Sequence, residues 1–218
     1  MIRKFLFICL CLNSMQSFAQ ESYLDILINY TPTKLHYGNN HSEIKDFRDE
    51  LWGWQIGATF QGGITPYFSV VPEFYYMEKG GRLDGSNASG IETTKTRFHV
   101  LELPILARLH YCHFFLNAGP SISLNMAGKI HTAETEESPS RSFKMPFNSG
   151  SEGYKRWDAA LHLGAGYEFK IKNSRIILDV RYYYGLVNMV QTGELYNRYF
   201  NINLLVSKPW KTNPFIKK

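Results

Sequence analysis

The fold is decided by residues 157–169, which read WDAALHLGAGYEF. Every odd-numbered position in this stretch is apolar, whereas the even-numbered positions are small or polar. Alternation with a period of two is typical of a β-strand that shows one face to an apolar environment and the other face to a polar one. Because this stretch is long, it predicts a strand that exceeds most strands of globular proteins.

Seven further stretches have the same period, and no stretch has a convincing helical period. They are residues 23–31, 52–61, 67–77, 98–109, 113–124, 175–187 and 198–207. The connections at 32–51, 78–97, 125–156 and 188–197 are long, and those at 62–66, 110–112 and 170–174 are short. An up-and-down meander gathers all the long loops at one end, as in barrels of the outer membrane. The sequence therefore predicts an all-β chain that folds as an eight-stranded antiparallel up-and-down transmembrane β-barrel.

The composition excludes several other classes of protein. Of the 218 residues, 44% are apolar and 20% are charged, which does not fit a disordered chain. Beyond the N-terminus, no run of apolar residues is long enough for a transmembrane helix. The net charge of +5 falls to +3 when Arg3 and Lys4 are removed with the first segment. So small an excess gives no reason to expect a nucleic-acid partner.

The first 19 residues have the pattern of a secretory signal peptide. Arg3 and Lys4 precede an apolar run at residues 5–12, and Ser17-Phe18-Ala19 forms a cleavage site before Gln20. We expect Sec export, cleavage after Ala19, a barrel domain at 20–207 and a basic C-terminal tail at 208–218. Neither Cys9 nor Cys11 follows the small residue of a lipoprotein signal. Cleavage leaves Cys112 as the sole cysteine, which excludes an intrachain disulfide and a cysteine-based zinc site.

The small and polar face of the strands is predicted to point into the barrel. The other face carries too many large aromatic side chains for the lumen of an eight-stranded barrel. All fourteen lysines lie outside the predicted strands. Aromatic residues near strand ends are expected to form two girdles at the membrane surfaces. They are Trp52, Tyr67, Phe68, Phe98, Tyr111, Trp157, Phe169 and Tyr199. We expect bulges at the three strand prolines, Pro72, Pro104 and Pro120.

Charged residues inside the predicted strands, except Arg198 at a strand end, alternate with apolar neighbours and therefore face the lumen. An arginine facing lipid at mid-depth would cost about 2–4 kcal/mol, which favours the same placement. The predicted lumenal charge network consists of Glu73, Glu102, Arg108, Asp158, His162, Glu168, Asp179 and Arg181. Asp25 is a sixth acid on this face, and Arg108 and Arg181 are its only predicted mid-strand cations. We expect a paired structural plug and a closed barrel, not a pore.

Five stretches in chain order carry a family resemblance. They read FSVVPEFYY (68–76), LELPILAR (101–108), LNAGP (116–120), LGAGYE (163–168) and LDVRYYYGL (178–186). Together they resemble the PorT-like outer-membrane β-barrel proteins of Gram-negative bacteria. The resemblance implies an eight-stranded outer-membrane barrel. One member is linked to protein secretion, although most members have no assigned activity. This chain departs from many outer-membrane barrels because it ends on a basic tail and not on a terminal aromatic residue.

Catalytic and metal sites have weaker support. His162 with Asp158, Asp179, Ser121 and Ser123 is the candidate set for a lipid-modifying barrel enzyme, but the lumenal placement of these residues argues against it. His36, His41, Glu43 and Asp46 share a loop without the spacing of metal ligands. Gly164-Ala165-Gly166 lacks the third glycine of a nucleotide fingerprint. We therefore expect no catalytic residue, no metal and no cofactor.

The predicted function is that of a non-enzymatic outer-membrane barrel. It would act through its external loops and termini as an interaction or assembly component, with a role in secretion implied by the resemblance. We expect a monomeric barrel in contact with outer-membrane lipid, and the 125–156 loop as either a protein-binding loop or a solvated one. The basic tail would touch lipid head groups, bind a periplasmic partner or remain solvated. The alternatives are a lipid-modifying barrel enzyme and a soluble lipocalin-like binder.

Overall fold

The computed structural model describes residues 22–38, 42, 44–85, 93–134, 139–151, 153–171 and 174–209. Several predicted features lie outside these residues: the signal peptide and its cleavage site, His41, Glu43, and the tail beyond Pro209. Within the described ranges, no helix has the length and apolar character needed to cross a membrane.

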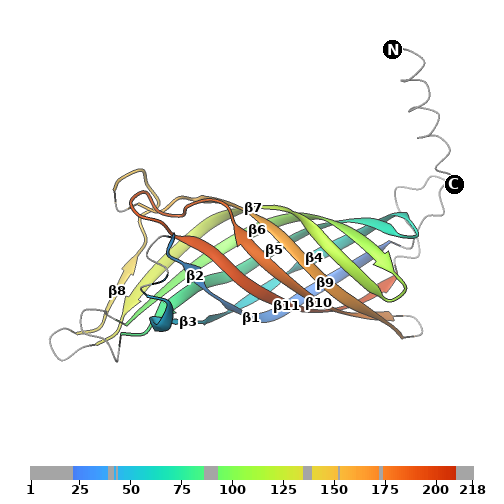
Figure 1. Ribbon diagram of the computed structural model, residues 1–218, viewed down its shortest axis with the longest axis horizontal. Coiled ribbons are helices and arrows are strands. Elements are labelled where there is room, and N and C mark those ends of the chain that lie inside the picture. The colour runs from blue at the N-terminus through green and yellow to red at the C-terminus, as the bar shows by residue number, and fades with distance from the viewer. Residues whose placement is uncertain are drawn as a thin grey trace, which may run out of the picture.

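Eight long strands form the wall of a barrel (Figure 1). They are β1 (Tyr23–Thr33), β4 (Leu51–Thr65), β5 (Phe68–Leu83), β6 (Thr94–Tyr111), β7 (Phe114–Thr132), β9 (Trp157–Ile171), β10 (Ser174–Gly185) and β11 (Tyr196–Pro209). Each strand pairs antiparallel with its neighbour in sequence order, and β11 pairs back with β1. The closed eight-stranded up-and-down barrel that the alternation predicted is therefore confirmed.

The two ends of the barrel differ. The tight turns, together with Ser22 and Pro209 at the limits of the described chain, lie at one end, which we call the short-turn end (Figure 1). The long connections lie at the other, the long-loop end. There the short strands β2 (Leu35–His36), β3 (Arg48–Asp49) and β8 (Arg141–Lys144) pair with β11, β5 and β7, and the 3-10 helix η2 spans Lys45–Phe47.

Several strands continue beyond their predicted limits at the long-loop end. Strand β5 runs to Leu83, where it pairs with Thr94, and β7 runs to Thr132. The prediction that long loops begin at residues 78 and 125 is therefore wrong. Backbone pairing continues past the apolar band, where the side-chain pattern no longer shows a lipid-facing strand.

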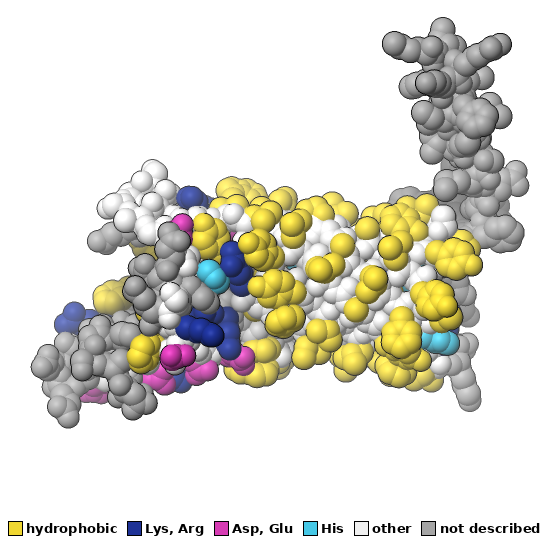
Figure 2. Space-filling model, in the orientation of Figure 1, with side chains coloured by type: hydrophobic (Ala, Val, Ile, Leu, Met, Phe, Trp, Pro, Cys, Tyr) yellow, Lys and Arg dark blue, Asp and Glu magenta, His cyan; other side chains and the backbone are white. Residues whose placement is uncertain are grey.

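The apolar side of every long strand faces outward. Leu163 is 67% exposed on the outer face, whereas its neighbour His162 is buried inside. The outward side chains form a broad apolar band around the barrel, and most charged side chains in view lie beyond the long-loop edge of this band (Figure 2). The predicted assignment of the two faces is confirmed.

The aromatic girdles are only partly as predicted. Trp52, Tyr67, Tyr111, Trp157 and Phe169 are exposed on the outer surface. Two predicted members, Phe98 and Tyr199, are instead buried inside the barrel. The reason is parity, because Phe98 lies four positions from lumenal Glu102 and Tyr199 lies four positions from lumenal Asn203 on their own strands.

The expected bulges at the strand prolines are absent. The register is unchanged across the pairs Pro72↔Ile105, Pro104↔Ser121 and Pro120↔Leu161. Register shifts lie elsewhere, between Gly63 and Thr65 and between His99 and Val100. A proline removes one N–H donor but leaves the backbone extended, and the flanking pairs are enough to hold the register.

Candidate functional site

The centre of the lumen is built around Arg181 on β10. Its Nη1 and Nη2 atoms donate to the two carboxylate oxygens of Glu73 at 2.6 and 2.8 Å, and its Nε donates to Asp179 at 2.7 Å. The guanidinium is 2% exposed. Gly164 on the neighbouring strand leaves room for this side chain, since a Cβ there would lie 2.7 Å from the Arg181 Cγ. A planar fork paired with two carboxylates is a strong and directional contact.

Arg108 on β6 is joined to this centre through an amide. Its Nε donates to Asn117 Oδ1 at 2.8 Å and its Nη1 donates to Gln61 Oε1 at 2.9 Å. Asn117 in turn donates to Asp179 at 3.0 Å, and the Arg108 guanidinium lies over the Phe115 ring at 4.1 Å. Arg108 therefore contacts neutral partners more closely than it contacts the Asp179 carboxylate, which is 3.9 Å away.

A second group, nearer the short-turn end, surrounds Arg175. Its nitrogens donate to Glu168 at 2.7 Å and to Asp25 at 3.1 Å, and the guanidinium lies 3.4 Å from the centroid of the Tyr23 ring. The sequence analysis did not single out Arg175, so the prediction that Arg108 and Arg181 are the only lumenal cations is wrong. Arg175 lies four positions before Asp179 on β10, so the alternation along this strand could have placed Arg175 in the lumen as well.

A third group, nearer the long-loop end, surrounds Lys79. The Nζ atom lies 3.3 Å from Glu102 Oε2 and 3.4 Å from Asp158 Oδ2, and it donates to the Tyr183 hydroxyl at 3.0 Å. The side chain is fully buried. The prediction that all lysines lie outside the strands is therefore wrong, because β5 continues through Lys79 with the alternation that places Glu73 inside.

His162 lies beside this third group. Its Nε2 is 2.9 Å from the Ser121 Oγ and 3.1 Å from the Glu102 Oε1. In a catalytic triad the serine and the acid contact opposite ring nitrogens, whereas here both approach the same one. Of the other candidate residues, Asp158 accepts hydrogen bonds from Tyr183 and Asn197, and Asp179 accepts one from Arg181. The geometry is that of a buried hydrogen-bond network.

The structure thus gathers all eight predicted network residues, with Asp25, inside the barrel. Six carboxylates face four permanent cations in the lumen of the described chain, and every one of these side chains is buried. The excess of acid is met by neutral donors: Tyr75 donates to Glu102 at 2.8 Å, for example. Buried charges of both signs with hydrogen-bond partners form a filled interior.

An apolar cap covers the long-loop end of the lumen. It consists of the buried residues Leu35, Phe98, Val100, Met145, Met189 and Leu195. The loops after β7 and β10 meet here, with Tyr154 paired to Val190 and Lys155 N donating to Met189 O at 2.8 Å. Burial raises the pKa of the Tyr37 phenol, which packs on this cluster, to about 12. The sequence analysis missed the cap as a unit, because its residues come from strands and loops that are far apart in the chain.

The remaining candidates do not form a site. In the described part of the chain, no three His, Cys, Asp or Glu side chains are placed to hold a metal ion. The His36 Nδ1 accepts a hydrogen bond from the Gly38 backbone at 3.1 Å. Cys112 is a free, exposed thiol in the turn between β6 and β7.

Three solved barrels illustrate the similarity to known structures. The attachment invasion locus protein Ail of Yersinia pestis, solved with the heparin analogue sucrose octasulfate, is 13% identical, with 87% of this chain and 99% of Ail covered and a TM-score of 0.42. Neisserial surface protein A is 8% identical, with 89% and 100% covered and a TM-score of 0.43. The N-terminal barrel of Pseudomonas aeruginosa OprF is 11% identical, with 87% and 98% covered and a TM-score of 0.34. At these values, none of them carries an argument about function.

The family comparison is more informative. A search of the curated proteins gave no significant match. The family described as outer membrane protein beta-barrel domain matches residues 18–191, which is most of the chain. This match agrees with the closed barrel, its apolar outer band and its charged lumen. The chain belongs to the outer membrane protein beta-barrel domain family.

Proposed function

We propose that this protein is a PorT-like barrel that acts, without catalysing a reaction, as an interaction or assembly component of the outer membrane. Its external loops and termini would contact partner proteins, and secretion across the outer membrane is the process that the PorT-like resemblance suggests. One observation carries the proposal: paired charges fill the lumen, and an apolar cap covers its long-loop end. A partner would therefore bind the external loops, because the filled lumen offers it neither a pore nor an internal cleft.

The segment that extends from β7 through β8 is the proposed contact surface. All four residues of β8 are exposed, and Phe143 within it is 51% exposed. An aromatic side chain on a projecting hairpin is typical of residues that contribute to protein interfaces. The proposal thus places partner binding within the 125–156 region.

Site-specific photocrosslinking in living cells tests this proposal. A photoreactive residue at Phe143 or Gln191, both exposed at the long-loop end, should form a crosslink to one discrete protein. The matched control is Leu163, which is exposed in the apolar band and should crosslink to no protein. Absence of a protein adduct at both loop positions, or the same adduct at Leu163, would contradict the proposal.

The proposal includes export and processing. We propose that residues 1–19 are a signal peptide cleaved after Ala19, that 20–207 form the barrel domain and that 208–218 are a basic tail. Intact mass of the purified protein should correspond to a chain that begins at Gln20. The protein should resist carbonate extraction and migrate at a heat-modifiable position on a gel. Recovery in the soluble periplasm without detergent would exclude membrane insertion.

The absence of catalysis is also testable. Lipids from cells that overproduce the protein should carry the same acyl chains as lipids from cells that lack it. A change in acylation that disappears in a His162→Ala variant would contradict the non-enzymatic proposal and favour a lipid-modifying enzyme. His162 is the informative position because it contacts both Ser121 and Glu102.

A further inference from the structure

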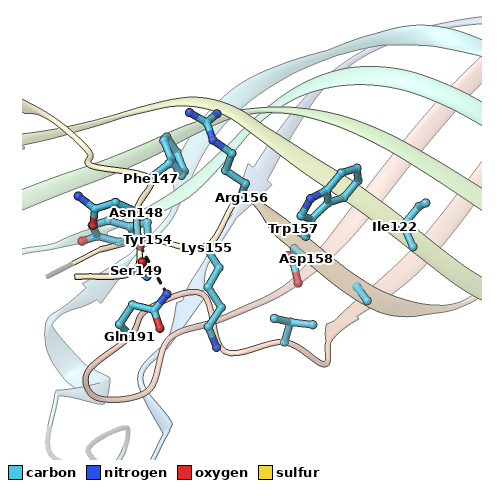
Figure 3. A pocket seen from close by; sticks show the side chains of 12 residues that line it. Ile122, Phe147, Asn148, Ser149, Tyr154, Lys155, Arg156, Trp157, Asp158 and Gln191 are labelled. Atoms are coloured by element: carbon cyan, nitrogen blue, oxygen red, sulfur yellow. Dashed lines mark hydrogen bonds between the residues drawn. The ribbon is translucent and has the colours of Figure 1, made fainter. Parts of the chain in front are cut away.

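A pocket of about 510 Å³ lies on the outer surface of the barrel at the long-loop end. Its floor is the outward face of β7 and β9, with Ile122, Trp157 and Ala159. The loops after β7 and β10 overhang it, and Figure 3 shows Phe147 and Arg156 above the strand that carries Trp157. The volume lies within the range of roughly 300–1,000 Å³ that is usual for small-molecule pockets.

The overhang is held in place by its backbone. The side-chain and backbone nitrogens of Asn125 donate to Lys155 O at 2.8 Å and to Arg156 O at 2.7 Å. Tyr154 N donates to Pro146 O at 2.8 Å. These bonds tie the loop both to β7 and to itself. The pocket is therefore preformed, which lowers the entropic cost of binding.

Two cations line the pocket without an acidic partner among the described residues. The Arg156 guanidinium lies 5.1 Å from the centroid of the Phe147 ring, and neither Arg156 nor Lys155 forms an ion pair with a described carboxylate. Asp158 is the acid among the lining residues, but its carboxylate points into the lumen and contacts Lys79. The charge on this wall of the rim is therefore positive and available.

The opposite wall of the rim is different. There Lys34, which follows β1, pairs with Glu50 at 3.1 Å. Lys34 thus has a neighbouring carboxylate, whereas Lys155 and Arg156 form no ion pair within the described chain. This difference points to an external anion at the pocket.

The depth of the pocket identifies the environment of that anion. Trp157, which is 62% exposed, lies at the first position of β9, and indole rings prefer the headgroup level of a bilayer. In Figure 2 the apolar band gives way to charged side chains towards this end of the barrel. The apolar floor therefore continues the lipid-facing surface, and the cations stand where phosphates of the leaflet lie.

We propose that this pocket binds one anionic, phosphate-bearing lipid of the leaflet at the long-loop end. An acyl chain packs on Ile122, Trp157 and Ala159 and the phosphate contacts Arg156, while Lys155, which Figure 3 shows extending in the opposite direction, adds positive charge at the pocket. Phe143, the exposed aromatic residue of β8 proposed above as a partner contact, does not line this pocket, although Gln191 and part of the 125–156 region do. The site depends on membrane insertion, which carbonate extraction tests independently.

Native mass spectrometry of the folded full-length protein in detergent tests the site. Titration with phosphatidylglycerol should yield one retained lipid at concentrations where phosphatidylcholine is not retained. The double variant Lys155→Gln/Arg156→Gln should weaken phosphatidylglycerol retention by about fivefold for each charge removed. The matched control is Lys34→Gln, which removes a rim cation from the opposite wall and should leave retention unchanged.

Two further arms separate a lipid from other occupants. Ala159→Phe fills the floor without changing charge, and it should reduce retention of phosphatidylglycerol. Heat-modifiable gel mobility checks that each variant is folded. Inorganic phosphate should not displace the lipid. Equal retention of the two lipids, an unchanged double variant, a Lys34→Gln loss as large as that of the double variant, or displacement by inorganic phosphate would each overturn the proposal.

Discussion

Two ion-paired cations, one in the lumen and one at the rim, have opposite relations to water. Arg181 is 2% exposed and contacts Glu73 and Asp179, whereas the Lys34 side chain is 41% exposed and pairs with Glu50 at 3.1 Å. Loss of the Lys34 ammonium leaves a carboxylate that water can solvate. Loss of the Arg181 guanidinium leaves two carboxylates that water reaches poorly. Charged side chains inside this barrel are therefore part of its packed interior, whereas charged side chains at the rim remain in contact with water.

The largest expected effect follows from removing Arg181. Arg181→Ala leaves Glu73 and Asp179 buried without their cation, which typically costs about 3–5 kcal/mol of unfolding free energy. The urea midpoint for unfolding in lipid vesicles should fall accordingly. Lys129→Ala is the control, because Lys129 is exposed on β7 beyond the apolar band. Equal midpoints for the two variants would mean that Arg181 is solvated, and the difference between lumen and rim would disappear.

A smaller effect is expected for Lys79→Met. This change removes the ammonium between Glu102 and Asp158, but Glu102 keeps the Tyr75 hydroxyl and Asp158 keeps Tyr183. Because these donors remain, the loss of unfolding free energy should be about 1–3 kcal/mol. The same urea titration measures it. A midpoint as low as that of Arg181→Ala would indicate that the neutral donors contribute little.

The smallest effect is expected at the rim. Lys34→Ala removes an exposed pair with Glu50, and such pairs contribute about 0–1 kcal/mol. The midpoint should stay within that range, and raising the salt concentration should shrink the difference from the unchanged protein. A loss comparable to that of Lys79→Met would show that rim pairs are as critical as lumenal ones.

The sequence was sufficient to predict the barrel because the same physical constraint acts on every strand. Lipid outside and a narrow lumen inside impose the same period-two pattern on residues 157–169 and on the seven other strands. The same parity placed Glu73, Asp179 and Arg181 in the lumen. The sequence analysis did not predict Lys79 and Arg175 as lumenal, because they lie at the ends of the apolar runs. Both nevertheless share the parity of lumenal residues on their own strands.

Features that depend on contacts between distant parts of the chain could not be predicted from the sequence. The cap forms because loops from different parts of the chain meet, with Tyr154 opposite Val190 and Met145 against Phe98 and Val100. The extension of β7 to Thr132 depends on backbone pairing with β6 and β8, which leaves no regular side-chain pattern. The sequence also does not show which side chains contact which ring nitrogen of a histidine, as at His162.

Conductance measurement in a planar bilayer tests the central claim most directly, namely that paired charges fill the lumen. The purified full-length protein should give no steady conductance steps, because Arg181, Arg108, Arg175 and Lys79 and their partners occupy the interior along its length. Steady, reproducible steps, with an amplitude that changes in Arg181→Ala, would contradict the account and show an open, water-filled pore.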